Sequence, residues 1–489
     1  MKNGNEMSET GILAYGAYVP RRRLQRAAIH AANKWFAPGL GGLAKGERAV
    51  ANWDEDSVTM AVEAARDCLT GVDRATVAGL TLASTTLPFA DRLNAGIVKE
   101  ALTLADATRA TDAAGSLRAG TGALLAALDG AHTQLCIASD LRKARPASEG
   151  ELLQGDGAAA LLVGRGEVVA RVVATHSVTV DFVDHFRRTG VDFDYGWEAR
   201  WIRDEGYTRL LGGAIRDALA GAGIAADSID HAVIPISVRG VAAGLAKKLG
   251  IRADAVADPL QATVGDTGAA HPLLMLVDAL EKAGPGQRIL LVGFGQGVDV
   301  ILLETTEALA RLPARRGLRG HLAARQEDGN YQRFLFHRGL IDLERGMRAE
   351  LDQKQPGSTL YRQRKAVLGL VGGRCTKTGT VQFPRTQVGV NPNDRTVGSQ
   401  EDYPLADRLA RIVTFTADSL SYSPDPPTYY GTVDFEGGGR LVAVFAEVSA
   451  ADVEVGRPMR MAFRINAVDE QRDFIKYFWK AVPANEGGQ

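Results

Sequence analysis

The chain has 489 residues, of which 45% are apolar and 24% charged, and its formal net charge is −1 at pH 7. This length predicts about two to four domains, and the balanced charge gives no electrostatic reason to expect binding to nucleic acid or to an anionic membrane. No apolar run approaches the roughly 18 residues that a membrane-spanning helix needs, so we expect none.

The start of the chain and its cysteines both indicate where the protein is located in the cell. The segment MKNGNEMSET (1–10) is polar and has no apolar signal core, which excludes a typical secretion signal. The three cysteines, Cys68, Cys136 and Cys375, are too few and too scattered for a disulfide framework. We therefore expect a cytoplasmic protein.

The first part of the chain alternates between apolar strands and helices. Strands are predicted at 11–20, 77–86, 133–140 and 155–164, an amphipathic helix within 45–69 and an apolar helix within 111–128. The same alternation returns further on, with strands at 170–180 and 231–237, helices at 205–224, 240–251 and 265–283, and a hairpin at 288–305. Two similar halves with glycine turns at corresponding places indicate an internal duplication, and near-continuous apolar strands are typical of sheets covered on both faces.

From about residue 311 the character of the sequence changes. The segment 330–358 is polar, partly helical by its pattern, and ends in a Pro-Gly break, which indicates a linker. From residue 366 onward, short runs such as RIVTFTADSL, TYYGTVDFE, RLVAVFAEVS and RPMRMAFRI alternate polar and apolar residues between turns. This period of two predicts a small β-barrel.

Two places carry side chains that suit chemistry. The stretch TDAAGSLRAGTGALLAAL (111–128) brings Ser116 to the start of an apolar helix. Serine is favoured there as an N-cap, and as a nucleophile it would need an adjacent base, yet no histidine lies nearby in the sequence. Asp266 and His271 lie five residues apart at a turn that enters a helix. They are either an acidic cap followed by a histidine or an acid/base pair, for which the pKa of histidine is suited.

Several motifs, in order, resemble the 3-hydroxy-3-methylglutaryl-CoA synthase family of the thiolase superfamily. They are GILAYGAYVPRRRL, GERAVANWDEDSVTMAVEAARDCL, SLRAGTGALLAAL, GDTGAAHPLL and RILLVGFGQG, which together cover residues 10 to 305. The later stretch VGGRCTKTGTVQFPR and the strands after it resemble the degenerate zinc ribbon and OB-fold that accompany thiolases.

The resemblance implies the fold class and the domain organisation. We expect a thiolase-type, five-layered, duplicated α/β core followed by a C-terminal all-β OB-fold barrel. The implied domains are a thiolase-like N-terminal half (1–165), a thiolase-like C-terminal half (166–310), a linker with helices (311–365), a degenerate zinc ribbon (366–400) and the OB-fold (401–482).

The chemistry of the family relies on a cysteine that is acylated, a histidine and a glutamate, and this chain has none of the three in place. Leu117 stands where the cysteine is expected, Thr85 where the glutamate is, and Pro235 where the histidine is. Asp266 replaces an asparagine of the family. An alignment shifted by one residue would place Ser116 at the nucleophile position, and Thr85 is either an ordinary strand-end residue or a ligand contact.

The resemblance also implies a coenzyme A thioester as substrate, whose phosphates favour Lys and Arg near a groove. The candidates for these contacts are Arg21, Arg22, Arg23, Lys247 and Lys248, each of which can instead be a solvated surface charge. Backbone N–H groups of the 293–297 turn, which includes Gly295, could hold an oxyanion. Tyrosines could donate a proton where they do not simply pack: Tyr15, Tyr18, Tyr195 and Tyr207.

The ribbon has lost most of the residues that a zinc site needs. Cys375 is present, but Thr378, Gly389 and Asp394 stand where the family usually has the other ligands. One cysteine cannot hold zinc, so we expect no metal.

Two functions follow from these residues. In the first, the chain binds an acyl-CoA and makes or breaks a carbon–carbon bond next to the thioester, by condensation or by aldol or retro-aldol chemistry, without a cysteine nucleophile. In the second, it is a non-catalytic scaffold or regulatory subunit of a complex with an active thiolase. Because thiolase-type cores usually pair through a sheet edge, the resemblance implies a homodimer or a heteromer with a thiolase-family subunit.

Overall fold

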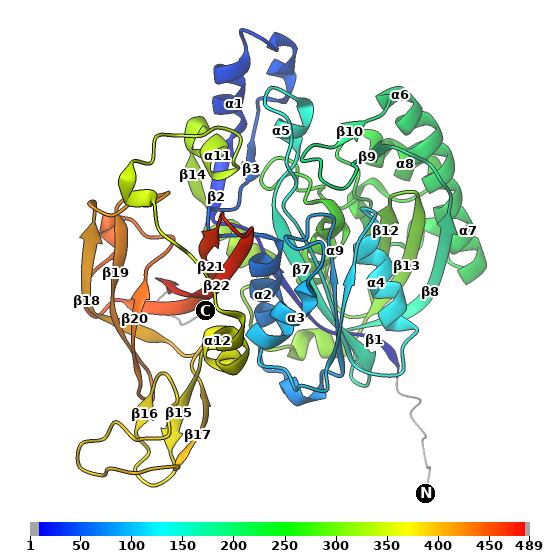
Figure 1. Ribbon diagram of the computed structural model, residues 1–489. Helices are drawn as coiled ribbons and strands as arrows, with labels where there is room; N and C mark the ends of the chain where they lie inside the picture. Colours follow the sequence, from blue (N-terminus) through cyan, green and yellow to red (C-terminus); the bar gives the residue numbers. More distant parts are fainter. Residues whose placement is uncertain (1–8, 485–489) are drawn as a thin grey trace, which may run out of the picture. The chain divides into compact units, whose positions relative to one another are not determined.

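The computed structural model describes residues 9–484, so the polar segment 1–8 lies outside the described residues (Figure 1). The chain forms two compact units. Unit 1 comprises 9–52, 56–96 and 105–334, and unit 2 comprises 53–55, 97–104 and 335–484. Within the described residues, no helix is both long and apolar enough to cross a membrane.

Unit 1 is built on one mixed sheet of nine strands. In spatial order they are β11 (His231–Val233), β12 (Arg288–Phe294), β13 (Gly297–Thr305), β8 (Ala170–Thr179), β1 (Thr10–Tyr18), β7 (Gly157–Arg165), β6 (Gln134–Asp140), β4 (Gly79–Ala83) and β5 (Arg109–Ala113). The strands β7, β6, β12 and β13 are buried along nearly their whole length, as expected for strands covered on both faces.

The sheet confirms the internal duplication. The first half has the order β5-β4-β6-β7-β1 and the second β11-β12-β13-β8. In both, the pair β4/β6 or β11/β12 is parallel and the following pairs are antiparallel. A parallel bridge between Ala232 and Val256 lies beyond β11, where the counterpart of β5 belongs. The two halves join where Gly11 and Ile12 of β1 pair with β8.

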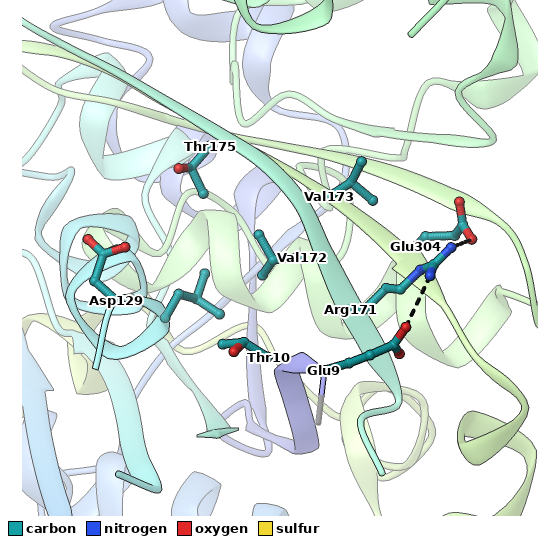
Figure 2. A pocket seen from close by; sticks show the side chains of 9 residues that line it. Glu9, Thr10, Asp129, Arg171, Val172, Val173, Thr175 and Glu304 are labelled. Carbon is teal, nitrogen blue, oxygen red and sulfur yellow. Dashed lines mark hydrogen bonds and ion pairs between the residues drawn. The ribbon is translucent and has the colours of Figure 1, made fainter. Parts of the chain in front are cut away.

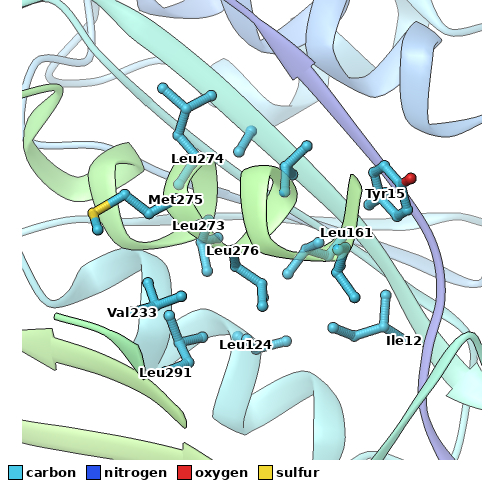
Figure 3. Packing of buried hydrophobic residues seen from close by; sticks show 14 of the residues in the cluster. Ile12, Tyr15, Leu124, Leu161, Val233, Leu273, Leu274, Met275, Leu276 and Leu291 are labelled. Atoms are coloured by element: carbon cyan, nitrogen blue, oxygen red, sulfur yellow. The ribbon is translucent and has the colours of Figure 1, made fainter. Parts of the chain in front are cut away.

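Helices complete five layers. The central layer holds α4 (Ala119–Leu128) and α9 (His271–Lys282), which contact strands of both halves. The outer layers are α2 (Ser57–Cys68) against the first half and α7 (Gly212–Ala222) with α8 (Val241–Leu249) against the second. Figure 3 shows Leu124 of α4 and Leu276 of α9 packed between Leu161 and Leu291 of the two half-sheets. This apolar layer fixes the N-terminal ends of both central helices.

Smaller elements surround this core. They are α1 (Arg26–Asn33), α3 (Asn94–Ala101, shared between the units), α5 (Glu149–Leu153), α6 (Ala199–Trp201), α10 (Gly317–Ala323) and α11 (Tyr331–His337), a three-stranded sheet of β14 (Gln326–Asp328), β2 (Arg22–Gln25) and β3 (Glu47–Ala49), and a hairpin of β9 (His185–Phe186) and β10 (Tyr195–Gly196).

Two elements differ from the sequence prediction. The helix expected over 205–224 is a π-helix over Ile202–Leu211 that continues into α7; inside it, the ring of Phe182 lies so close to Gly206 that an added Cβ would come within 2.8 Å of it. The strand expected over 231–237 ends at Val233, because Pro235 lacks the N–H that a ladder needs.

Unit 2 contains two antiparallel sheets. The larger has the order β20 (Arg440–Val444), β19 (Thr428–Phe435), β18 (Ala410–Asp418), β21 (Pro458–Asp469) and β22 (Phe474–Pro483). A bridge between Phe445 and Ala481 brings the end of β20 to β22, which closes the sheet toward a barrel. The smaller sheet pairs β16 (Val381–Gln382), β15 (Val371–Cys375) and β17 (Gln400–Pro404), and α12 (Gly357–Arg362) and α13 (Arg364–Val367) precede it.

Candidate active site

The N-terminal end of α4 lies against the turn between β12 and β13. The hydroxyl of Ser116 donates to the carbonyl of Gly295 at 2.9 Å and accepts from the N–H of Arg118, the N-cap residue, at 3.2 Å. The N–H of Gly295 donates to the carbonyl of Gly297 at 3.1 Å, inside the hairpin. The Ser116 hydroxyl hydrogen is therefore directed at a carbonyl rather than at a base.

Glycine makes this contact between turn and helix possible. A Cβ at Gly293 would lie 2.1 Å from Oγ1 of Thr121, and a Cβ at Gly295 would lie 2.7 Å from Oγ of Ser116. A Cβ on Gly120 of α4 would lie 2.3 Å from the carbonyl oxygen of Ala269. The start of α4 thus touches both the hairpin turn and the turn that leads into α9.

A buried carboxylate beside this helix start holds Arg118. Asp299 of β13 lies 2.7 Å from Nη1 of Arg118 and accepts from the hydroxyls of Thr121 at 2.8 Å and Ser177 at 2.6 Å. All the donors come from α4 or β8, so this cluster joins the helix to the second half-sheet. The Nε of Arg118 also donates to the carbonyl of Gly295 at 3.3 Å, the oxygen that accepts from the Ser116 hydroxyl, so this guanidinium lies beside Ser116 while Asp299 holds it.

The end of β6 supplies a second buried carboxylate, Asp140. Its oxygens accept from the hydroxyls of Ser84, Thr85 and Thr86, each at 2.9 Å, and from the N–H groups of Thr85 at 2.7 Å and Ala269 at 2.8 Å. Asp140 therefore binds the turn after β4 to the turn before α9. The Thr85 hydroxyl, a predicted site group, donates within this structural cluster.

Asp266 and His271, predicted as a pair, do lie together. The Asp266 carboxylate is half-buried; its Oδ1 accepts from the N–H of Gly268 at 2.9 Å and its Oδ2 from the hydroxyl of Ser237 at 3.0 Å. Burial raises the pKa of Asp266, but the His271 ring, the Arg142 guanidinium and these two hydrogen bonds outweigh it, so the net pKa is lowered. The carboxylate is ionised at neutral pH.

His271 begins α9 and is 2% exposed. Its Nδ1 faces the N–H of Thr267 at 3.3 Å and the Thr267 hydroxyl at 3.4 Å. Burial lowers the pKa of His271, and the Asp266 carboxylate and the Pro259 carbonyl, which raise it, do not compensate. The imidazole is therefore neutral at pH 7 and lies next to a charged carboxylate.

Arg142, Ser237 and Tyr207 face Asp266 from separate elements. The sequence pattern did not identify two of them, Arg142 and Ser237, as candidate site residues. Arg142 follows β6 and forms an ion pair with Asp194 at 2.6 Å. Burial lowers the pKa of Arg142, but the carboxylates of Asp194 and Asp266 raise it by more, so the net pKa is raised. Burial, Asp184 and Asp266 raise the pKa of Tyr207, so its phenol keeps its proton. Both Arg142 and Ser237 follow strand ends, where ligand sites of α/β folds gather.

The basic residues predicted for phosphate binding are not gathered at this site. Arg22 lies on β2, where its Nη1 is 3.4 Å from Oδ2 of Asp328. Lys247 and Lys248 are exposed in the last turn of α8, whereas Ser237 precedes the first turn of that helix. Among the tyrosines, Tyr15 and Tyr18 are buried on β1 and Tyr195 is exposed on β10, so only Tyr207 is close to Asp266.

A separate cavity of about 550 Å³ lies at the other end of α4 (Figure 2). Leu128 and Asp129 line it, whereas Ser116 precedes the first turn of the same helix. Arg171 also lines the cavity and forms ion pairs with Glu9 at 3.0 Å and Glu304 at 2.5 Å. This cavity is therefore distinct from the site around Asp266.

The segment predicted as a degenerate zinc ribbon, 366–400, has one thiol in a polar setting. Cys375 is buried, and its Sγ lies 3.2 Å from Oγ of Ser399 and 3.4 Å from Oγ1 of Thr396. Hydrogen bonds from Ser399, Thr378 and Thr396 lower the pKa of Cys375 to about 6. One thiolate with hydroxyl neighbours does not make a zinc site, and no group of three or more His, Cys, Asp or Glu that could hold a metal ion occurs in 9–484.

Comparisons with known proteins agree with this architecture. Residues 219–302 match the family described as 3-oxoacyl-[acyl-carrier-protein (ACP)] synthase III C terminal, and residues 404–464 match the ChsH2 C-terminal OB-fold domain. Among solved structures, MvaS in complex with 3-hydroxy-3-methylglutaryl coenzyme A superposes with a TM-score of 0.58 at 22% identity, covering 70% of this chain and 93% of that one. The 3-oxoacyl-(acyl carrier protein) synthase III of Pseudomonas aeruginosa superposes with a TM-score of 0.55 at 21% identity, covering 61% and 99%.

These structural likenesses show the fold, and the sequence relatives show the family. The hydroxymethylglutaryl-CoA synthase of Archaeoglobus fulgidus is 30% identical over 317 residues, 62% of this chain and 91% of that protein. That of Aeropyrum pernix is 31% identical over 314 residues, 62% of this chain and 86% of that protein. The chain therefore belongs to the hydroxymethylglutaryl-CoA synthase family of the thiolase superfamily and carries a C-terminal OB-fold domain fused to its core.

Proposed function

We propose that the chain binds an acyl-CoA thioester and makes or breaks the carbon–carbon bond next to it without forming an acyl-enzyme. The observation that carries the proposal is the Asp266 carboxylate, ionised and half-buried between Ser237, Arg142 and His271. The relatives are named for hydroxymethylglutaryl-CoA synthesis, which supports a CoA thioester as substrate. Leu117 at the nucleophile position supports a route without acyl transfer.

In the direction of cleavage, Asp266 acts as the general base on a β-hydroxyacyl-CoA. The carboxylate takes the proton of the β-hydroxyl, the Cα–Cβ bond breaks, and its electron pair moves into the enolate of the thioester while the β-carbon becomes a carbonyl. The positive end of the α4 dipole stabilises the enolate oxygen. Asp266 then returns the proton to the α-carbon. Condensation runs through the same steps in reverse.

The test compares Asp266→Asn with Ser116→Ala. The substrates are 3-hydroxy-3-methylglutaryl-CoA for cleavage into acetyl-CoA and acetoacetate, and acetyl-CoA with acetoacetate for condensation. We expect Asp266→Asn to lower kcat/KM about 100-fold or more, the usual contribution of a general base. Ser116→Ala, which loses only a hydrogen bond to a carbonyl, should change it less than about threefold.

Mass spectrometry of the intact protein after incubation with acetyl-CoA separates this route from acyl transfer. The proposal predicts no adduct. A stable acyl group on Ser116, together with loss of activity in Ser116→Ala, would contradict it and restore nucleophilic catalysis.

A second function is supported by the same positions. Leu117, Thr85 and Pro235 stand where the family has its chemical groups, and the Thr85 hydroxyl is bound to Asp140. These losses favour a non-catalytic subunit that assembles with an active thiolase. Under this alternative the purified chain is inactive alone, and Asp266→Asn leaves the activity of a reconstituted complex unchanged.

We also propose that the chain pairs through the outer edge of β5, either with its own copy or with a thiolase-family subunit. β5 ends the nine-stranded sheet and has β4 as its neighbour, so its outer edge presents unpaired backbone groups. The free cysteines Cys68, Cys136 and Cys375 support a reducing, cytoplasmic location.

A further inference from the structure

Unit 2 holds a cavity of about 640 Å³ that the proposed function does not use. Its walls come from α12, α13, β15, β17 and the loop that joins β16 to β17. The lining residues are Arg362, Gln363, Arg364, Lys365, Ala366, Val371, Arg385, Thr386, Gln387, Gly398, Gln400 and Asp402. A cavity of this size is in the range of small-molecule sites.

The lining carries an excess of positive charge. Its cations are Arg362, Arg364, Lys365 and Arg385, and its carboxylate is Asp402. Two of these cations share that carboxylate: Nζ of Lys365 lies 2.7 Å from Oδ2, and Arg385 binds Oδ1. The hydrogen bond from Lys365, together with that from Arg385, lowers the pKa of Asp402, so this carboxylate is ionised. Its single negative charge balances one of the two cations, which leaves a net charge of +1 in this group.

The remaining two cations belong to the helical wall. Nε of Arg364 lies 3.5 Å from Oε1 of Glu100, a carboxylate outside the lining, which also pairs with Lys99 at 3.3 Å. Arg362 is exposed at the end of α12, and no ion pair to it occurs among residues 9–484. Within the lining itself, four cations face one carboxylate.

The sheet wall brings a buried amide, that of Gln400, to the cavity. Gln400 and Asp402, two residues apart on β17, lie on one face opposite Cys375 and Gly373 of β15. Gly373 lets the Gln400 side chain lie against β15, since a Cβ there would come within 2.6 Å of Oε1 of Gln400. Gln400 is 8% exposed, and neither its amide nitrogen nor its amide oxygen has a hydrogen-bond partner within the described part of the chain. A buried amide without a partner costs free energy that a polar ligand can recover.

We propose that this cavity binds a small anion with two or more linked phosphate groups. Guanidinium groups match phosphate oxygens with paired hydrogen bonds, and three of the four cations are arginines. A single phosphate would contact one group of cations, whereas a diphosphate can contact both the pair Lys365 and Arg385 beside Asp402 and Arg362 at the end of α12. Gln363 and Gln387 add neutral donors along the same lining.

The test uses inorganic pyrophosphate as the probe and isothermal titration calorimetry of the full chain. We expect saturable binding with one site per chain, and binding of orthophosphate at least about tenfold weaker because it contacts fewer cations. ADP serves as a second arm: equal affinity for ADP and pyrophosphate assigns the site to the phosphates alone, and tighter binding of ADP assigns it to a nucleotide.

The variants isolate the charges of the cavity. The double variant Arg362→Gln/Lys365→Gln should bind pyrophosphate at least about tenfold more weakly, and Arg362→Lys/Lys365→Arg should restore binding to within about threefold. Lys377→Gln removes one positive charge from an exposed residue that does not line the cavity and should leave the affinity unchanged. Absence of saturable binding by the wild type, or equal weakening by Lys377→Gln, would overturn the proposal.

Discussion

At the scale of single residues, Asp140 determines how two turns of the candidate site lie. It accepts five hydrogen bonds, from three hydroxyls and two N–H groups, on segments before α9 and after β4. Asp140→Asn keeps the size and shape of the side chain, but replaces one carboxylate oxygen, a hydrogen-bond acceptor, with an NH2 group. This NH2 group would face the hydroxyl and N–H donors around it. We expect unit 1 to lose about 3 kcal/mol of unfolding free energy in urea, the cost of one or two charge-assisted bonds.

The matched control for Asp140 is Asp204→Asn. Asp204 is half exposed and pairs with Arg203 on the surface at 2.9 Å, an interaction that solvent screens. The urea midpoint of this variant should equal that of the wild type. Similar losses of unfolding free energy in the two variants would show that the buried cluster around Asp140 stabilises unit 1 no more than a surface ion pair does.

His271 gives a prediction about pH. Its pKa is lowered in the folded protein, so the unfolded chain binds a proton that the folded chain does not. Stability from this residue is present above the unfolded pKa of about 6.5 and is lost as the pH falls toward the lowered folded pKa. Between pH 7 and pH 5, the wild type should lose up to about 1.4 kcal/mol per pH unit more than His271→Asn does. Equal slopes in urea titrations of the two proteins would refute the assignment.

At the scale of elements, the hairpin turn between β12 and β13 and the start of α4 fit only because Gly293 lacks a side chain. Gly293→Ala would place a Cβ 2.1 Å from Oγ1 of Thr121, which is itself bound to Asp299. We expect a loss of about 1–3 kcal/mol in unfolding free energy, as for other overpacked positions. Gly213→Ala in α7, where a Cβ meets nothing within 4 Å, is the control and should be neutral or slightly stabilising.

The elements also show what sequence patterns could and could not reveal. The long apolar strands, the continuous apolar run of α4 and the amphipathic pattern of α9 are visible in the sequence, so the duplicated core was predictable. The strand β5 has no apolar face, since Arg109 and Thr111 are exposed, and the sequence indicated only its end, at the start of the stretch 111–128. The last strand of the larger sheet in unit 2, β22, was missed. The π-helix before α7 follows from contacts around Gly206, which local sequence does not record.

Some residues of the candidate site could likewise be predicted from the sequence and others could not. Asp266 and His271 were predictable as neighbours because one turn separates them. Ser237 and Arg142 were not, because they follow different strands and meet Asp266 only when the sheet is assembled. That Leu117 stands at the nucleophile position stays a prediction from the motif. The hydrogen bond from the Thr85 hydroxyl to Asp140 could not be predicted, because it joins separate strand ends.

At the scale of the whole molecule, duplication explains why the site lies where it does. Helices α4 and α9 occupy equivalent places in the two halves and share the central layer. Their starts therefore meet: Gly120 of α4 lies against Ala269 in the turn before α9. Two positive helix ends near one ionised carboxylate, Asp266, form a setting for an anionic intermediate. The domain boundaries at 310, 365 and 400 stay predictions.

The last prediction concerns association through β5. In a twofold pairing of this edge, the central residue of the strand, Thr111, lies close to its own copy. The wild type should then have a solution mass of twice 52.0 kDa by light scattering, and Thr111→Arg should shift it toward 52.0 kDa at low salt because two added cations repel. Ala107→Arg adds the same charge in the exposed turn before β5 and should leave the dimer intact. A monomeric wild type, or a dimer that persists in Thr111→Arg, would mean that this edge does not join copies of the chain.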